Sequence, residues 1–229
     1  LDVERRRVSA FEKTLASRTE RSFVVSNIDR NAIGSDRVRV VPLGIDTHLF
    51  RRGREISRHP VICFTGNMFY QPNVDAVCWF VKHCWASIKQ ELPDVQLIIA
   101  GDNPQSCVLE LAANDSSIIV TGRVASISNV INSATVSIAP MKSGSGMQFK
   151  VLEAMACSVP VVSTTLGLGD ISALPGRDLL IADKPSEFID HTIKLVRSIE
   201  LNLKIGENGL KFVLQNHSWD VVNNKFLLE

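Results

Sequence analysis

The strongest constraint on the fold is a regular alternation of short apolar segments and amphipathic segments that begins near residue 60. Strands of this kind, almost wholly apolar, are predicted at 61–65, 95–100, 118–121, 136–139, 160–163 and 179–182. Helical spacing of apolar residues predicts helices at 72–90, 108–112, 127–132, 149–156, 186–197, 201–214 and 219–228. Apolar strands separated by helices are typical of a parallel sheet covered on both faces. The sequence therefore predicts an α/β fold of six β/α units, a Rossmann-like doubly wound parallel sheet.

Residues 1–45 do not follow this alternation. They predict a helix over 3–16, a strand over 23–26, a short helix and a strand over 38–41, followed by a turn. This length suggests the tail of another domain rather than a domain. Because the chain also begins without Met, we expect an excised piece of a longer protein.

The composition excludes several classes of protein. With 45% apolar residues among 229 the chain can bury a sizeable core, and a formal net charge of +1 lacks the excess of a dedicated nucleic-acid binder. No apolar run approaches the roughly 18–20 residues of a membrane-spanning helix. The five cysteines form no C-x-x-C pair and the five histidines show no metal-ligand spacing. We therefore expect a reducing compartment, no disulfide framework and no metal site.

Positive charge is concentrated near the N-terminus. Residues 1–59 hold thirteen Lys or Arg against eight Asp or Glu, with clusters at Arg5–Arg7 and Arg51–Arg54. Two interpretations stay open: contact with anionic lipid or phosphate, or an ordinary solvated helix face and linker.

Glycines follow the first three strands of the alternation, at Gly66, Gly101 and Gly122, and the fourth strand leads into a glycine-containing turn at 140–148. Ligands of open parallel sheets bind beyond the carboxyl ends of the strands. A glycine turn at a helix N-terminus suits a phosphate or diphosphate. Lys150 and Glu153 share one face of the helix that follows. This pairing suits a nucleotide, while an ordinary loop with an i,i+3 ion pair is the alternative.

Several segments resemble family-4 glycosyltransferases of the GT-B fold. The longest is Gly146–Val162, which is similar to the signature stretch of that family. Others are Val40–Asp46, Phe64–Met68 with Pro72–Ala76 (similar to one sugar-transferase subgroup), Val120–Val124 and Ser218-Trp219. The matches run through essentially the whole chain in the family's order.

The resemblance implies two regions and a donor site. Residues 1–45 would be the tail of the N-terminal acceptor domain with the interdomain crossing, and residues 46–229 the C-terminal nucleotide-sugar-binding domain. Glu153 falls at the family glutamate that holds the ribose hydroxyls. The implied donor-binding residues are Gly66, Asn67, Arg123, Val124, Gly144, Ser145, Gly146, Met147, Gln148, Lys150 and Glu153.

This chain departs from the family pattern at three positions. Ser145 replaces a glutamate that contacts the donor sugar in many relatives, and Asn67 and Pro72 replace an Arg and a Lys. We expect Lys150 to take over the phosphate role of these cations, with Lys142 as its competitor. No residue is predicted as nucleophile or general base.

The resulting hypothesis is a retaining hexosyltransferase fragment that uses a nucleotide sugar, no cofactor and no metal. The acceptor would be a saccharide or lipid-linked sugar in cell-surface polysaccharide or glycoconjugate synthesis. The expected location is cytoplasmic, with peripheral contact to the inner face of the membrane through the basic N-terminal part, and no nucleic-acid partner. Two alternatives stay open: a non-catalytic nucleotide-sugar-binding module, and a GT-B nucleotide-sugar 2-epimerase.

Overall fold

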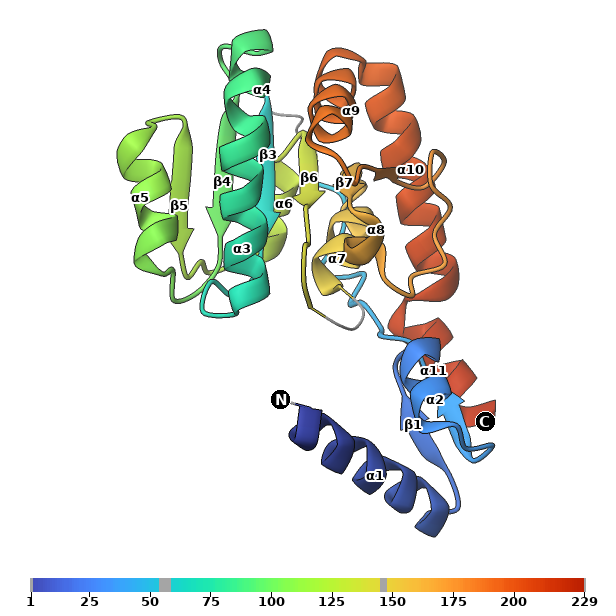
Figure 1. Ribbon diagram of the computed structural model, residues 1–229. Coiled ribbons are helices and arrows are strands. Elements are labelled where there is room, and N and C mark those ends of the chain that lie inside the picture. The colour runs from blue at the N-terminus through green and yellow to red at the C-terminus, as the bar shows by residue number, and fades with distance from the viewer. Residues whose placement is uncertain (1, 54–58, 145–147, 229) are drawn as a thin grey trace.

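Two parallel sheets organise the chain, which a computed structural model describes over residues 2–53, 59–144 and 148–228 (Figure 1). The first is two-stranded, and its region comprises α1 (Asp2–Arg18), β1 (Ser22–Val24), α2 (Asn27–Ile33) and β2 (Val38–Val40). In Figure 1 these elements lie below the larger sheet, with α1 at the bottom centre and α2 and β1 at the lower right.

The second sheet has six strands, all parallel to their neighbours. Its strands are β3 (Val61–Thr65), β4 (Gln96–Ala100), β5 (Ile118–Gly122), β6 (Val136–Ala139), β7 (Val161–Ser163) and β8 (Leu180–Ile181). The helices are α3 (Gln71–Phe80), α4 (Ala86–Glu91), α5 (Ser106–Asn114), α6 (Ile127–Ser133), α7 (Phe149–Ala156), α8 (Thr165–Leu168), α9 (Pro185–Arg197), α10 (Ile199–Asn216) and α11 (Trp219–Leu228).

The strand order is β5-β4-β3-β6-β7-β8, so the chain runs outward in one direction from β3 and then in the other from β6. This is the doubly wound order of Rossmann-like sheets, and the prediction of that fold class is confirmed. The point where the direction reverses, between β3 and β6, is the topological switch point, beyond which such sheets bind their ligands.

The core has two layers because the central strands are apolar on both faces. Along β3, Ile62 and Phe64 belong to the cluster that also holds Phe80 of α3 and Phe188 of α9. On the opposite face, Ile131 of α6, Leu152 of α7 and Val213 of α10 form a second cluster. Helices therefore cover both faces, as the apolar strands predict.

The helix predicted over 72–90 contains one wide turn. Between α3 and α4 the backbone forms a π-helical segment, η1 (Val81–Trp85), whose Cys84 and Trp85 are buried. The wide turn rotates the part of the helix that follows it, so different residues face the core there. The apolar pattern of the part that precedes the turn is unchanged. The sequence pattern also gives no indication of α8.

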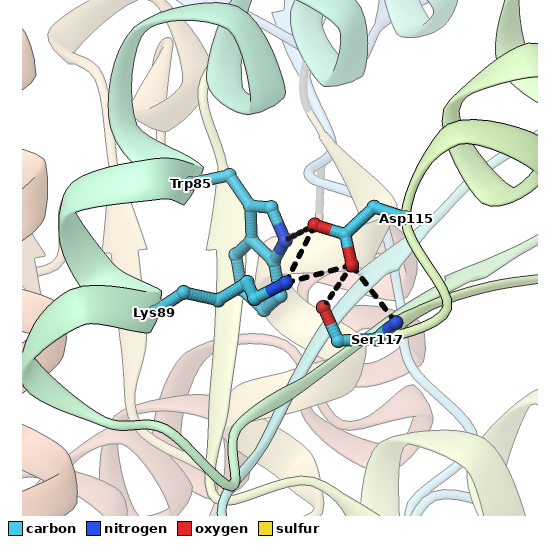
Figure 2. A network of polar contacts seen from close by, with 4 residues as sticks. All are labelled: Trp85, Lys89, Asp115 and Ser117. Carbon is cyan, nitrogen blue, oxygen red and sulfur yellow. Dashed lines mark hydrogen bonds and ion pairs between the residues drawn. The ribbon is translucent and has the colours of Figure 1, made fainter.

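Asp115, which ends α5, ties the α5–β5 turn to α4 (Figure 2). Its carboxylate accepts bonds from Trp85 Nε1 at 3.1 Å, Lys89 Nζ at 2.9 Å and Ser117 Oγ at 2.6 Å. Burial opposes ionisation, but the bonds from Ser117 and Lys89 outweigh it and lower the pKa of Asp115 to about 2. The ionised Asp115 carboxylate therefore holds the turn before the edge strand β5 against α4.

The chain passes twice between its two regions, and the passages touch. Ile45 N donates to the carbonyl of His217 at 2.6 Å, and His217 Nδ1 lies 2.9 Å from the carbonyl of Leu43. Beyond His217, the Phe226 ring of α11 lies 4.8 Å from the Phe23 ring of β1. The C-terminal helix thus packs beside the first sheet. The proposed division into residues 1–45 and 46–229 stays a prediction.

Within the described ranges, no helix combines the length and apolar character that crossing a bilayer requires.

Candidate functional site

A cleft of about 530 Å³ lies beyond the carboxyl ends of β3, β4 and β5, against the N-terminus of α7. Its lining comes from segments that are far apart in the sequence: Phe50, Thr65, Gly66, Asn67, Tyr70, Asn73, Gly101, Asp102, Arg123, Val124, Ile127, Gln148, Phe149, Lys150 and Glu153. A larger hollow of about 710 Å³ lies between α4 and α9, but the predicted donor-binding residues do not line it. The switch-point cleft is therefore the candidate site.

Close backbone approach shapes the first loop of the cleft. A Cβ built on Gly101 would lie 1.7 Å from the carbonyl oxygen of Gly66, so a side chain at residue 101 would displace that loop. Gly66 in turn packs against Asn73, whose Nδ2 donates to the carbonyl of Asn67 at 2.9 Å. Glycine at both positions lets the β3 and β4 loops meet at the floor of the cleft.

Lys150 reaches from the first turn of α7 across the end of the sheet to α3. Its Nζ donates to Asn73 Oδ1 at 3.1 Å and to Gln148 Oε1 at 2.9 Å, and lies 5.4 Å from the centroid of the Phe64 ring. The residue is only 8% exposed. Burial lowers the pKa of Lys150 to about 8, while the Glu153 carboxylate acts in the opposite direction. Lys150 is therefore a buried lysine rather than a solvated one.

Glu153 lies one turn further along α7 and is half-buried in the same cleft. Burial raises the pKa of its carboxyl group, and the Lys150 charge lowers it. Lys150 and Glu153 therefore give the cleft a cation and a carboxylate that are both partly removed from water, beside Arg123 and Asp102 of the same lining. Such groups interact more strongly with a ligand than solvated ones do.

Lys142, the competitor of Lys150, turns away from the cleft. Its Nζ lies 3.8 Å from the centroid of the Trp79 ring and donates to the carbonyl of Asp183 at 3.3 Å. Neither partner lines the cleft.

The structure brings seven of the eleven predicted site residues into one cleft: Gly66, Asn67, Arg123, Val124, Gln148, Lys150 and Glu153. Gly144 does not line it and lies instead beside Pro72 and the Tyr70 hydroxyl. Ser145, Gly146 and Met147 lie outside the described residues. The ligand roles of all eleven stay predictions.

Sequence reasoning missed several residues of the lining, of which Asn73 and Thr65 matter most. Asn73 is buried and holds both Lys150 and the first loop, although it stands in the Pro72–Ala76 segment that carries the family resemblance. Asn73 gave no local signal of this role, because Gln71 and Asp75 at the start of the same helix are polar too. Thr65 ends a buried strand, where its hydroxyl gave no signal.

No group of three His, Cys, Asp or Glu side chains gathers to hold a metal among the residues that the structure describes. That the site works without a metal stays a prediction.

The sequence model of one protein family, "Glycosyl transferases group 1", matches residues 59–198, which contain the whole six-stranded sheet and all of the cleft except Phe50. The chain belongs to this family. The match confirms the resemblance on which the site prediction was built.

Two curated relatives illustrate the family. An uncharacterized 44.6 kDa protein in the cps region of Klebsiella pneumoniae is 26% identical over 163 residues, which cover 68% of this chain and 42% of that protein. A GDP-mannose-dependent alpha-(1-6)-phosphatidylinositol dimannoside mannosyltransferase of Mycobacterium tuberculosis is 28% identical over 192 residues, which cover 77% of this chain and 47% of the enzyme. The chain spans about half the length of these relatives or less.

A solved structure agrees in fold. Anabaena HepE, crystallised in complex with UDP-glucose, superposes with a TM-score of 0.80 over 96% of this chain and 66% of HepE, at 13% sequence identity. At this identity the likeness establishes the fold alone.

Proposed function

We propose that this chain is the donor-binding part of a retaining glycosyltransferase that moves a hexose from a nucleoside-diphosphate sugar to a saccharide or lipid-linked sugar. The observation that carries the proposal is the pairing of buried Lys150 and half-buried Glu153 in a cleft at the switch point. Family membership supports it, as do the GDP-mannose named for the mycobacterial relative and the UDP-glucose bound to HepE.

In this proposal the two charged groups divide the donor between them. Glycosyl transfer breaks the bond between the anomeric carbon and the diphosphate oxygen, and negative charge grows on the departing diphosphate. The Lys150 ammonium, held by Asn73 and Gln148, stabilises that charge in a site of low polarity. Glu153 accepts hydrogen bonds from the ribose hydroxyls. No metal ion takes part in the proposal.

A second candidate is a nucleotide-sugar-binding module without transferase activity. Asn67 lines the cleft where many relatives carry an Arg, and Pro72 stands where they carry a Lys. Both candidates require donor binding, and sugar transfer by the full-length protein distinguishes them.

The deciding experiment is nucleotide binding by the purified chain and its Glu153→Gln variant. We expect UDP or GDP to bind in calorimetric titrations, and the variant to lose roughly 1–3 kcal/mol of binding free energy, as hydrogen bonds to a charged group typically contribute. Glu110→Gln is the control, because Glu110 is an exposed carboxylate on α5 outside the cleft. If the chain binds neither UDP nor GDP, or if Glu153→Gln binds the nucleotide as tightly as the unaltered chain, the proposal is contradicted.

A further inference from the structure

Two buried hydroxyl groups lack a hydrogen-bond partner among the described residues, those of Thr65 and Thr192. Thr65 is 2% exposed and Thr192 is fully buried. Only Thr65 lines the switch-point cleft, whereas Thr192 lies within α9. Leaving a buried hydroxyl unpaired costs free energy, so buried polar groups are nearly always paired. An unpaired hydroxyl in a ligand cleft is suited to a bond that forms when the ligand arrives.

The side of the sheet on which Thr65 lies follows from strand alternation. Ile62 and Phe64 of β3 face the layer of α3 and α9. Successive strand residues point to opposite faces, so Cys63 and Thr65 face the layer of α6 and α7. Thr65 therefore points to the face of the sheet from which Glu153 enters the cleft.

The level of Thr65 along the sheet follows from its place in β3. It is the last residue of that strand, so it lies at the carboxyl edge of the sheet.

The α7 helix joins the parallel strands β6 and β7, so it runs opposite to them and begins at the carboxyl edge of the sheet. Glu153 of α7 and Thr65 of β3 both line the cleft at that edge.

We propose that Thr65 is a further donor-binding residue, whose hydroxyl joins Glu153 in binding the vicinal ribose diol of the nucleotide. The inference rests on the proposed function, because it requires a nucleoside diphosphate in the cleft. A diol offers two O–H donors and several lone pairs, while an ionised carboxylate can only accept. The Thr65 hydroxyl supplies the missing donor, and its oxygen can also accept a bond.

The test compares Thr65→Val, which keeps the side chain's shape and removes the hydroxyl, with Thr65→Ser, which keeps the hydroxyl. Thr192→Val is the matched control, since it removes the other unpaired hydroxyl of the described residues, which does not line the cleft. Calorimetric titrations use UDP and GDP, each beside its 2′,3′-dideoxy analogue. We expect Thr65→Val to weaken UDP or GDP binding about tenfold and to leave dideoxy-analogue binding unchanged. Thr65→Ser should retain most of the affinity, and Thr192→Val all of it.

Three results would overturn the inference. Unchanged binding by Thr65→Val would show that its hydroxyl has no role, and equal losses for the normal and dideoxy nucleotides would place its contact away from the ribose. If Thr65→Val does not fold, Thr65→Ser decides. A Thr65→Ser variant that binds UDP only as weakly as the unaltered chain binds the dideoxy analogue would exclude a contact through the hydroxyl. Failure of the unaltered chain to bind any nucleotide would instead reject the proposed function, and the inference with it.

Discussion

Lys150 is an uncommon residue at the scale of single side chains, because a lysine is seldom buried without a carboxylate directly bonded to it. Its ammonium group donates to the amide oxygens of Asn73 and Gln148 and lies 3.9 Å from the Met141 sulfur, none of which carries a charge. These oxygens orient the ammonium group but cannot neutralise it. The positive charge therefore remains available to an anion that enters the cleft.

Replacing Lys150 by Ala should weaken diphosphate binding steeply and nucleoside binding hardly at all. A charge-assisted hydrogen bond to phosphate contributes roughly 1.5–3 kcal/mol, and a nucleoside has no phosphate to receive it. Lys142→Ala is the control, because its ammonium group lies over the Trp79 ring. Titrations with uridine, UMP and UDP measure the difference. Equal losses for uridine and UDP in Lys150→Ala would reject the role in phosphate binding.

The affinity for UDP should also depend on pH through Lys150. Burial lowers its pKa to about 8, so the free site loses its charge as pH rises through that value. Bound diphosphate favours the protonated lysine, and binding therefore takes up a proton above this pKa. We expect UDP affinity to fall about tenfold between pH 7 and pH 9. Uridine affinity should stay constant, and a flat UDP profile would show that Lys150 does not contact the diphosphate.

At the scale of secondary-structure elements, the Asp115 network determines how the α5–β5 turn meets α4 (Figure 2). Asp115→Asn keeps the side chain's shape but removes the charge that Lys89 and Ser117 bind. We expect the variant to lose about 1–2 kcal/mol of unfolding free energy at pH 7, a range lowered for partial solvent exposure.

The unfolding free energy lost in Asp115→Asn should be largest at neutral pH and should decrease in acid. The pKa of Asp115 is lowered from 3.8 to about 2 in the folded protein, so between these values the unfolded chain binds more protons. Its stabilising contribution is complete above pH 4 and disappears as pH falls toward 2. Urea unfolding of the unaltered chain and Asp115→Asn at several pH values should give two curves that converge near pH 2. A constant separation would exclude ionised Asp115 as the cause.

The same scale shows why the sequence predicts some elements and not others. Strands such as β3 and β6 are runs of buried, mostly apolar residues bounded by glycine or proline, and a local pattern suffices to predict them. The wide turn η1 leaves no local mark, because the apolar spacing before and after it remains helical. The strand order depends on contacts between distant segments, which a local sequence pattern does not contain.

The sequence also predicts the site only where a residue stands in a recognisable local segment. The glycine positions, Lys150 and Glu153 stand in recognisable segments, and the structure brings them to one cleft. Asn73 was missed because its partner Lys150 is 77 residues away, and the bond between them exists only after the sheet has formed. Thr65 was missed because a threonine at the end of a strand fits the strand pattern without any ligand.

At the scale of the whole molecule, we expect the 229-residue chain to bind nucleoside diphosphates and to transfer no sugar by itself. The chain spans 42% of the Klebsiella relative and 47% of the mycobacterial enzyme. A two-domain transferase needs its second domain to close over the donor and exclude water. Incubation with UDP-glucose or GDP-mannose and mixed saccharide acceptors, followed by mass spectrometry, measures transfer. Any glycosylated product made by the chain alone would refute this prediction.

The two touching passages between the regions of the chain also have a mechanical consequence. A single covalent link lets two bodies both bend and twist about it. Here a second link, through Ser218, runs beside the first through Ile45, and backbone hydrogen bonding joins the two. Such a double link resists twisting far more than bending. We therefore expect any motion between the first sheet and the six-stranded sheet to bend about this double link rather than to twist around it.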